Sequence, residues 1–247
     1  MPWTLAIETS NPSAWEPGDP LRPGIALLDG DSTTHVEEID PTRIHEDELL
    51  PAIDRLTRRA SLTPRDITRI AVSAGPGGFT AVRMAITIAK TIADVTSAHA
   101  IAVPTAHSLA AAAHGSGRAL ASITGPFAVA LASKGDTAWI AHFDDRGQPV
   151  APGEILHAAD LARRPLATLI ADRFLPLPFT QFAQQHHIPI QRPIFDPVAC
   201  ARASLTLHPT PPAQLLPLYP RPPEAIRKWR ELHGDKPRAP VQPKPTA

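Results

Sequence analysis

The sequence predicts an α/β protein with a regular first half and a proline-rich second half. A strand and a hairpin open the chain, and helices then alternate with strands as far as a glycine–serine stretch at residues 115–117. That order is typical of a sheet with helices packed on its faces. From residue 149 onward lie 19 of the 30 prolines, so we expect shorter elements and more rigid loops there.

Three short strands are predicted first, over residues 3–7, 25–28 and 33–39. Asp29-Gly30 is a hairpin turn signal, so we expect the three strands to pair antiparallel in order. Residues 11–23 form a loop that contains four prolines.

Helical periodicity then appears over residues 45–60, where one face is apolar and Pro51 marks the place at which the regular helix begins or kinks. One capped turn at residues 63–66 precedes a strand at 70–72. The rest of this half comprises a helix at 80–95, a strand at 100–103 and a helix at 106–114 that Thr105 can cap.

The second half begins with strands predicted over residues 127–131 and 137–143, which we expect to pair. A buried strand at 166–171 and a short helix from Asp196 to Leu205 follow. We therefore divide the chain into an N-terminal subdomain (1–117), a C-terminal subdomain (118–233) and a disordered proline-rich tail (234–247).

The composition excludes several classes of protein. Lys plus Arg and Asp plus Glu each number 24. The net charge is therefore zero, and the excess of positive charge that is typical of proteins that bind nucleic acid directly is absent from the composition. The single cysteine, Cys200, excludes an internal disulfide and a multi-cysteine metal site. We expect a soluble, cytoplasmic chain, because the sequence has neither a membrane-spanning apolar run nor a signal peptide.

A glycine-rich segment, Gly75-Pro76-Gly77-Gly78-Phe79-Thr80, enters the helix at 80–95. Backbone N–H groups at such a junction can bind phosphate, with Glu8 and Thr9 at a strand end as partners for a nucleotide-linked Mg²⁺. The segment matches neither the Walker A nor the Rossmann spacing. A tight strand-to-helix turn therefore remains the alternative.

The helix at 80–95 is apolar over most of its circumference and has one polar stripe, formed by Arg83, Thr87, Lys90 and Asp94. A helix on one sheet needs an apolar stripe of only about 100°. A second surface must therefore cover it, either the helix at 49–60 or a partner chain.

Candidate catalytic residues do not combine into a site. His45 begins an HExxH-like segment, but Leu49 stands where the second histidine is required. His107 and His114 lie seven residues apart on one helix without an acidic residue for a metal site, and we interpret them as surface or helix-end histidines. No Gly-x-Ser-x-Gly elbow is present, which also argues against a peptidase.

The order of motifs resembles the TsaB family, the dimerisation subunit of the bacterial machinery that makes threonylcarbamoyladenosine in tRNA. The resemblance is carried by residues 5–10, His45 with residues 48–51, the loop from Gly75 to Arg83, and Lys90. The segment at 217–225 resembles the family's C-terminal Pro-x-Tyr-x-Arg motif.

The resemblance implies an actin/Hsp70/sugar-kinase-like α/β fold of two subdomains, with mixed sheets and flanking helices. It also implies a non-catalytic scaffold without a metal site. Such a subunit pairs with a catalytic TsaD-like subunit, joined by a TsaE-like ATPase, for threonylcarbamoyl transfer to the adenosine beside the anticodon. ATP and Mg²⁺ then belong to the complex, and this chain meets tRNA only indirectly.

For the partner surface the resemblance points to the first two long helices. The expected contact residues are Leu49, Ile53, Leu56, Val82, Met84, Ile88 and Ile92. The same helices could pair two copies of the chain when the partner is missing. The alternative function is a small actin-fold ATPase or kinase that binds nucleotide through Glu8, Thr9 and the loop at 75–80.

The glycine loop departs from the family pattern at two positions. Gly78 replaces the usual serine and Ala81 replaces a glycine, and both changes make phosphate binding less favourable. The loop at 11–23 also lies where actin-like ATPases hold phosphate.

Overall fold

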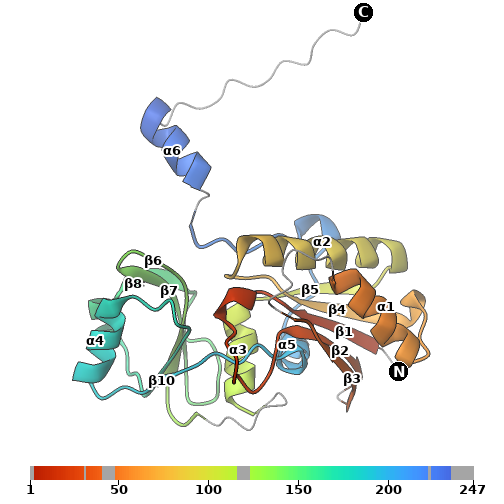
Figure 1. The fold of residues 1–247 in the computed structure, drawn as a ribbon, viewed down its shortest axis with the longest axis horizontal. Helices are drawn as coiled ribbons and strands as arrows, with labels where there is room; N and C mark the ends of the chain where they lie inside the picture. The colour runs from red at the N-terminus through yellow and green to blue at the C-terminus, as the bar shows by residue number, and fades with distance from the viewer. Residues whose placement is uncertain (1–2, 31, 41–47, 116–122, 222–223, 235–247) are drawn as a thin grey trace, which may run out of the picture.

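Two five-stranded mixed sheets form the framework of the chain, and helices pack on both faces of each (Figure 1). The computed structural model describes residues 3–30, 32–40, 48–115, 123–221 and 224–234. His45 and the predicted tail beyond Gly234 lie outside these ranges.

The first sheet has the strand order β3-β2-β1-β4-β5. Its strands are β1 (Trp3–Glu8), β2 (Gly24–Asp29), β3 (Ser32–Glu38), β4 (Ile67–Ser73) and β5 (His99–Val103). β1, β2 and β3 pair antiparallel in order, as the sequence predicts, whereas β4 and β5 run parallel to β1.

Both long predicted helices cover one face of this sheet: α1 (Leu49–Arg59) and α2 (Phe79–Thr96). The strand period of two sends Leu5 and Ile7 toward these helices and Ala6 toward the opposite face. Pro51 lies in the first turn of α1, where its missing N–H leaves no hydrogen bond unmade.

The second sheet has the order β10-β9-β6-β7-β8. Its strands are β6 (Phe127–Lys134), β7 (Thr137–Phe143), β8 (Glu154–His157), β9 (Thr168–Ala171) and β10 (Ile190–Gln191). α3 (Thr105–Ala113) packs on one face, while α4 (Leu177–Gln185) and the 3-10 helix η4 (Ala158–Arg163) lie on the other.

Helix α5 (Pro197–Ala203) returns the chain from the second sheet to the first, where it packs on the face opposite α1 and α2. Asp196 caps it by accepting a hydrogen bond from the Val198 N–H at 3.0 Å. Further along, Leu215 joins the core beneath α2. The C-terminal half thus forms the second sheet and also packs on both faces of the first sheet. The predicted boundary at 117/118 lies outside the described residues and stays a prediction.

Several features differ from the sequence prediction, and strands β8 and β10 were not predicted. Thr105 is the first residue of α3 rather than its cap, and its hydroxyl lies 2.9 Å from that of Ser73 instead of bonding the helix N-terminus. Helix α4 was not predicted, because Pro176 and Pro178 resemble loop prolines although both fit a helix start. Helix α6 (Glu224–His233) was also missed, and it stands apart from the two sheets in Figure 1.

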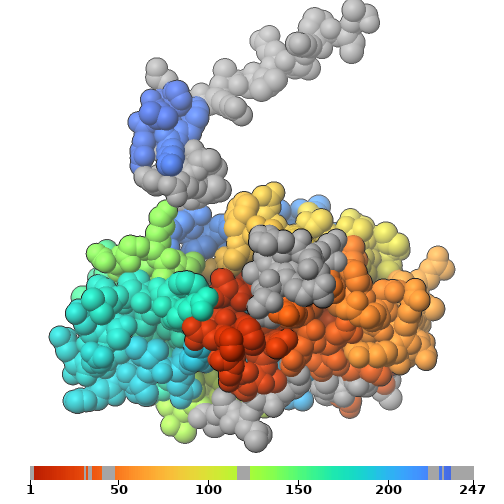
Figure 2. Space-filling view, in the orientation of Figure 1, coloured from red at the N-terminus to blue at the C-terminus, as the bar shows by residue number. Residues whose placement is uncertain are grey.

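The proline-containing loop at 11–23 contacts loops of the second sheet. Glu16 forms ion pairs with Arg173 and Arg192, and Asp19 forms another with Arg192. Asn11 donates a hydrogen bond to Asp172 at 3.2 Å. The space-filling view shows this segment (red) between the first subdomain (orange) and the second (cyan) (Figure 2). The loop therefore ties the two subdomains together.

None of the helices in the described part of the chain is long and apolar enough to cross a membrane.

Candidate functional site

Glu8 lies at the end of β1 but is completely buried. Its Oε1 accepts hydrogen bonds from the backbone N–H of Ser10 at 3.2 Å and from the Ser10 hydroxyl at 2.7 Å. Oε2 has no hydrogen-bond partner among the described residues. Burial raises the pKa of Glu8, and hydroxyl groups around it, first that of Ser10, offset the effect in part.

The groups around Glu8 form a buried polar cluster that sequence reasoning missed. These groups come from β1 and the segment after it, β4, α3, and α5 with its N-cap residue: Glu8, Ser10, Ser73, Thr105, Ser108, Asp196 and Cys200. Burial raises the pKa of the Cys200 thiol well above its ordinary value. The cluster lies inside the protein, so these groups hold elements together and are not presented to a ligand.

Hydrogen bonds to two other segments hold the glycine-rich loop. The Gly78 N–H donates to the Ser10 carbonyl at 2.7 Å, and the Thr105 N–H donates to the Gly75 carbonyl at 2.8 Å. Gly75 has a φ of 101°, which only glycine adopts without strain. A Cβ on Gly77 would lie 2.2 Å from the Ser10 carbonyl oxygen, so close backbone contact requires glycine there as well.

These contacts favour the tight-turn interpretation of the loop over phosphate binding. The Gly78 N–H that could bind an anion is already paired within the chain. Thr9 is half-buried, and Thr80 is exposed in the first turn of α2. The fold brings the loop and the residues after β1 together. They meet through backbone hydrogen bonds within the chain, which supports a structural junction rather than a phosphate site.

The C-terminal segment crosses from the glycine loop to the second sheet. The Leu218 N–H donates to the Ala74 carbonyl at 2.7 Å, and the Tyr219 ring stacks on Phe79 with centroids 5.4 Å apart. The Arg221 guanidinium donates to the Ala132 carbonyl and the Thr137 hydroxyl in the β6–β7 hairpin. The Pro-x-Tyr-x-Arg segment thus connects the two subdomains through contacts with both.

Five of the seven predicted interface residues are buried inside this chain. They belong to one core beneath α1 and α2: Leu49, Ile53, Leu56, Val82 and Ile88. Met84 and Ile92 are partly buried. The wide apolar band of α2 is covered by the first sheet and the C-terminal segment around Leu215, in a core that also contains residues of α1. A partner surface on these helices would therefore use their exposed residues instead.

The exposed strip of α2 follows the predicted polar stripe. Arg83, Thr87 and Asp94 are exposed, and Lys90 is half-buried. The Arg83 guanidinium lies 4.9 Å from the centroid of the Phe79 ring. Thr91 and Val95 extend the strip, and Leu50 adds an exposed apolar residue on α1.

The described residues contain no group of three or more histidine, cysteine or acidic side chains that could hold a metal ion. His107 and His114 are half-buried and lie at the two ends of α3, the first turn and the C-cap, in agreement with the interpretation as helix-end histidines. Their rings pack against Phe143 and Phe127, with centroids 5.8 Å and 5.5 Å apart respectively.

The two mixed sheets and their flanking helices define an actin/Hsp70/sugar-kinase-like protein with two subdomains. A sequence model of the family described as TsaD, tRNA N6-adenosine threonylcarbamoyltransferase, matches residues 39–163, just over half of the chain, and the chain belongs to this family.

One characterised relative is the tRNA threonylcarbamoyladenosine biosynthesis protein TsaB of Bacillus subtilis (strain 168). The two sequences are 35% identical over 89 residues, which is 36% of this chain and about a third (35%) of the relative's length. This match confirms the resemblance to TsaB found in the sequence.

Two solved structures have the same fold. YeaZ from Pseudomonas aeruginosa matches 89% of this chain and all of its own, with 18% identity and a TM-score of 0.63. An uncharacterized protein described as similar to peptidase YEAZ from Pseudomonas aeruginosa matches 90% of this chain and all of its own, with 20% identity and a TM-score of 0.66. At these identities the likeness shows the fold alone.

Proposed function

We propose that this chain is a non-catalytic subunit that pairs with a TsaD-like catalytic subunit for threonylcarbamoyl transfer to the tRNA adenosine beside the anticodon. The observation that carries the proposal is that the groups expected to bind a nucleotide are used inside the chain itself. Glu8 is buried, and the Gly78 N–H is bonded to Ser10 within the chain. Membership of the family and the likeness to TsaB supply the pathway. ATP and Mg²⁺, and a TsaE-like ATPase, then act at the level of the complex.

Helices α1 and α2 provide the partner surface in this proposal. They lie side by side on the outer face of the first sheet (Figure 1). Beside the charged side chains of Arg83, Lys90 and Asp94, their exposed strip carries small or apolar side chains at Thr87, Thr91, Val95 and Leu50. Val95 is 78% exposed and Leu50 is 47% exposed, so burial of these side chains by a partner would contribute binding free energy. Small threonine side chains let a second helix approach closely.

A substitution on the exposed strip tests this surface without disturbing the core. Thr91→Arg places a long cationic side chain at an exposed position on α2, where the wild-type hydroxyl bonds only to the Thr87 carbonyl at 2.9 Å. We expect at least about 10-fold weaker association with the TsaD-like subunit, measured by calorimetry, at an unchanged melting temperature. Gln184→Arg on the exposed face of α4 is the matched control and should bind like wild type. Equal binding by both variants would place the contact elsewhere.

A reconstituted reaction tests the non-catalytic role. The TsaD-like subunit, an ATPase of the TsaE type, threonylcarbamoyl-adenylate and unmodified tRNA are combined with and without this chain. We expect modification only when the chain is present, and no ATP turnover by the chain alone. Tight ATP–Mg²⁺ binding with hydrolysis by the isolated chain would instead support the small actin-fold ATPase or kinase.

A further inference from the structure

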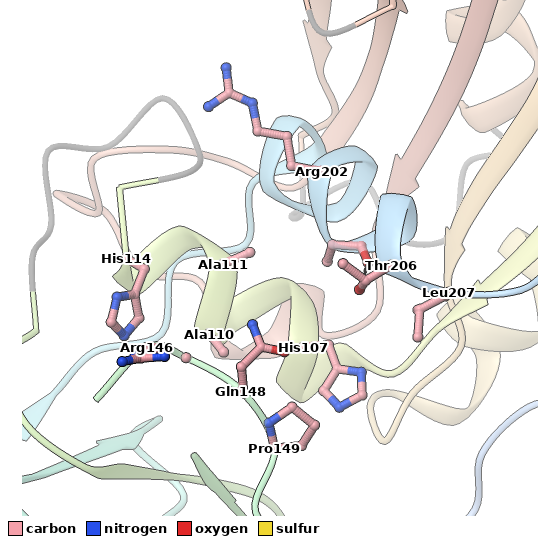
Figure 3. Close-up of a pocket in the computed structure, with 12 residues that line it drawn as sticks. His107, Ala110, Ala111, His114, Arg146, Gln148, Pro149, Arg202, Thr206 and Leu207 are labelled. Atoms are coloured by element: carbon pink, nitrogen blue, oxygen red, sulfur yellow. Dashed lines mark hydrogen bonds between the residues drawn. The ribbon is translucent and has the colours of Figure 1, made fainter. Parts of the chain in front are cut away.

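Two adjoining cavities follow one side of α3 and share His107 and Pro149. The first has a volume of about 350 Å³, and the second about 510 Å³. We call the first the α3 groove; its polar lining residues are His107, His114, Arg146, Gln148, Arg202 and Thr206 (Figure 3). Both volumes are in the range of small-molecule sites.

One wall of the α3 groove is a rigid turn after β7. The Asp144 Oδ1 accepts hydrogen bonds from the backbone N–H groups of Arg146 and Gln148, at 2.9 and 2.8 Å. The Asp144 N–H in turn donates to the Gln148 carbonyl at 2.9 Å. Gly147 has a φ of 73° and lies against the His114 ring, where a Cβ would come within 2.9 Å. The turn therefore presents the Arg146 and Gln148 side chains from a fixed backbone.

The opposite wall is α3 itself, and His107 marks the junction of the two cavities. Its ring packs edge-on against Phe143, which stacks on Phe127 at a centroid distance of 5.1 Å. The His107 side chain makes no hydrogen bond to any described residue, and burial lowers its pKa. The ring is thus held in place with its polar atoms uncommitted. Between His107 and His114 the groove is lined by the small side chains of Ala110 and Ala111.

The charged lining residues of the groove are cationic, although Asp144 and Asp145 directly precede Arg146 in the turn. No carboxylate lines it, and neither Arg146 nor Arg202 forms an ion pair with a described residue. Six other arginines of the described chain do pair with acidic residues: Arg55, Arg58, Arg59, Arg163, Arg173 and Arg192. Figure 3 shows the Arg146 side chain next to His114, whereas the Arg202 guanidinium points away from the groove. Arg146 is therefore the cation placed to meet an anionic ligand.

The second cavity is largely apolar. Its lining includes Pro104, Trp139, Val150 and Pro152, and the backbone of Gly153 covers the Trp139 ring. A ligand that fills both cavities therefore carries an anionic group at one end and an apolar body at the other.

We propose that the α3 groove and the adjoining cavity bind a small organic phosphate of the nucleoside monophosphate class. Arg146 pairs with the phosphate, Gln148 and His107 offer hydrogen bonds to the middle of the ligand, and the base lies in the cavity beside Trp139. The site is separate from the partner surface, because α3 packs on the second sheet and α5 packs on the face of the first sheet opposite α1 and α2. The proposal therefore does not depend on the proposed function.

Calorimetric titration of the full chain with AMP tests the proposal, with adenosine and inorganic phosphate titrated in parallel. We expect saturable one-to-one binding of AMP, at least about 10-fold tighter than that of either fragment. Arg146→Gln should weaken AMP binding by at least about 10-fold. Ala111→Leu, which fills part of the groove, should abolish it. Arg163→Gln removes an exposed arginine on η4 and should bind AMP like wild type.

Melting temperatures close to that of wild type establish that the variants are folded. No saturable binding of AMP, or equal binding by Arg146→Gln and wild type, would overturn the proposal. Phosphate or adenosine binding as tight as that of AMP would overturn the assignment of one cavity to each half of the ligand.

Discussion

Replacing Gly77 by alanine tests whether the glycine-rich loop is a structural junction. The added Cβ would lie 2.2 Å from the carbonyl oxygen of Ser10 and 2.9 Å from its carbonyl carbon. Both are backbone atoms, so no side-chain rotation can relieve the overlap. The loop and the segment after β1 must separate by roughly 1 Å, since carbon and oxygen atoms at rest lie more than about 3 Å apart.

The expected cost follows from two contributions. Forced overpacking of a buried contact costs about 1–3 kcal/mol. Separation also lengthens the 2.7 Å hydrogen bond from the Gly78 N–H to Ser10, which contributes about 0.5–1.5 kcal/mol. We therefore expect Gly77→Ala to lower the free energy of unfolding by about 2–4 kcal/mol, with a fall in melting temperature on the order of 5–10 °C.

Urea denaturation followed by circular dichroism measures this change, and the neighbouring glycine supplies a matched control. A Cβ on Gly78 would meet no atom closer than 3.6 Å, so Gly78→Ala, which also replaces the N-cap glycine of α2, should cost no more than about 1 kcal/mol. Equal stability of Gly77→Ala and Gly78→Ala would refute the argument that loop contact with Ser10 requires glycine.

Three further predictions concern buried groups. Burial raises the pKa of Glu8 from its ordinary value near 4.5, so the stability it contributes is complete below that pH and is lost as the pH rises through the folded-state value. Urea midpoints between pH 4 and 8 should therefore fall less steeply for Glu8→Gln than for wild type; parallel curves would contradict this. Asp196→Ala removes the cap of α5 and should lower the free energy of unfolding by about 1 kcal/mol, and an unchanged urea midpoint would count against the cap. The buried Cys200 thiol, whose pKa is raised, should resist a thiol reagent at pH 8 in the native protein and react fully in urea; rapid native labelling would show that the thiol is accessible.

The first subdomain could be predicted closely because its signals are local. Alternation of side chains along the strands, the Asp29-Gly30 turn and the period of α1 and α2 all act within about 20 residues. The return of α5 to the first sheet could not be predicted in this way. Its apolar residues fit either sheet, and only contacts between distant segments decide which one they cover.

The candidate site was harder to predict than the fold. Glu8 has the sequence position of a ligand-binding residue, but its burial depends on Ser10, Ser73 and Ser108, which come from three different segments. The wide apolar band of α2 indicated a second covering surface correctly. That Leu215, far along the chain from α2, supplies part of it has no signal in the sequence of the helix itself.

Association with the TsaD-like subunit tests the central claim most directly. The purified full chain is mixed with that subunit and analysed by size-exclusion chromatography with light scattering. The account predicts a new peak at the mass of the heterodimer, which Thr91→Arg reduces and Gln184→Arg leaves unchanged. Two unshifted peaks from folded proteins would contradict the account.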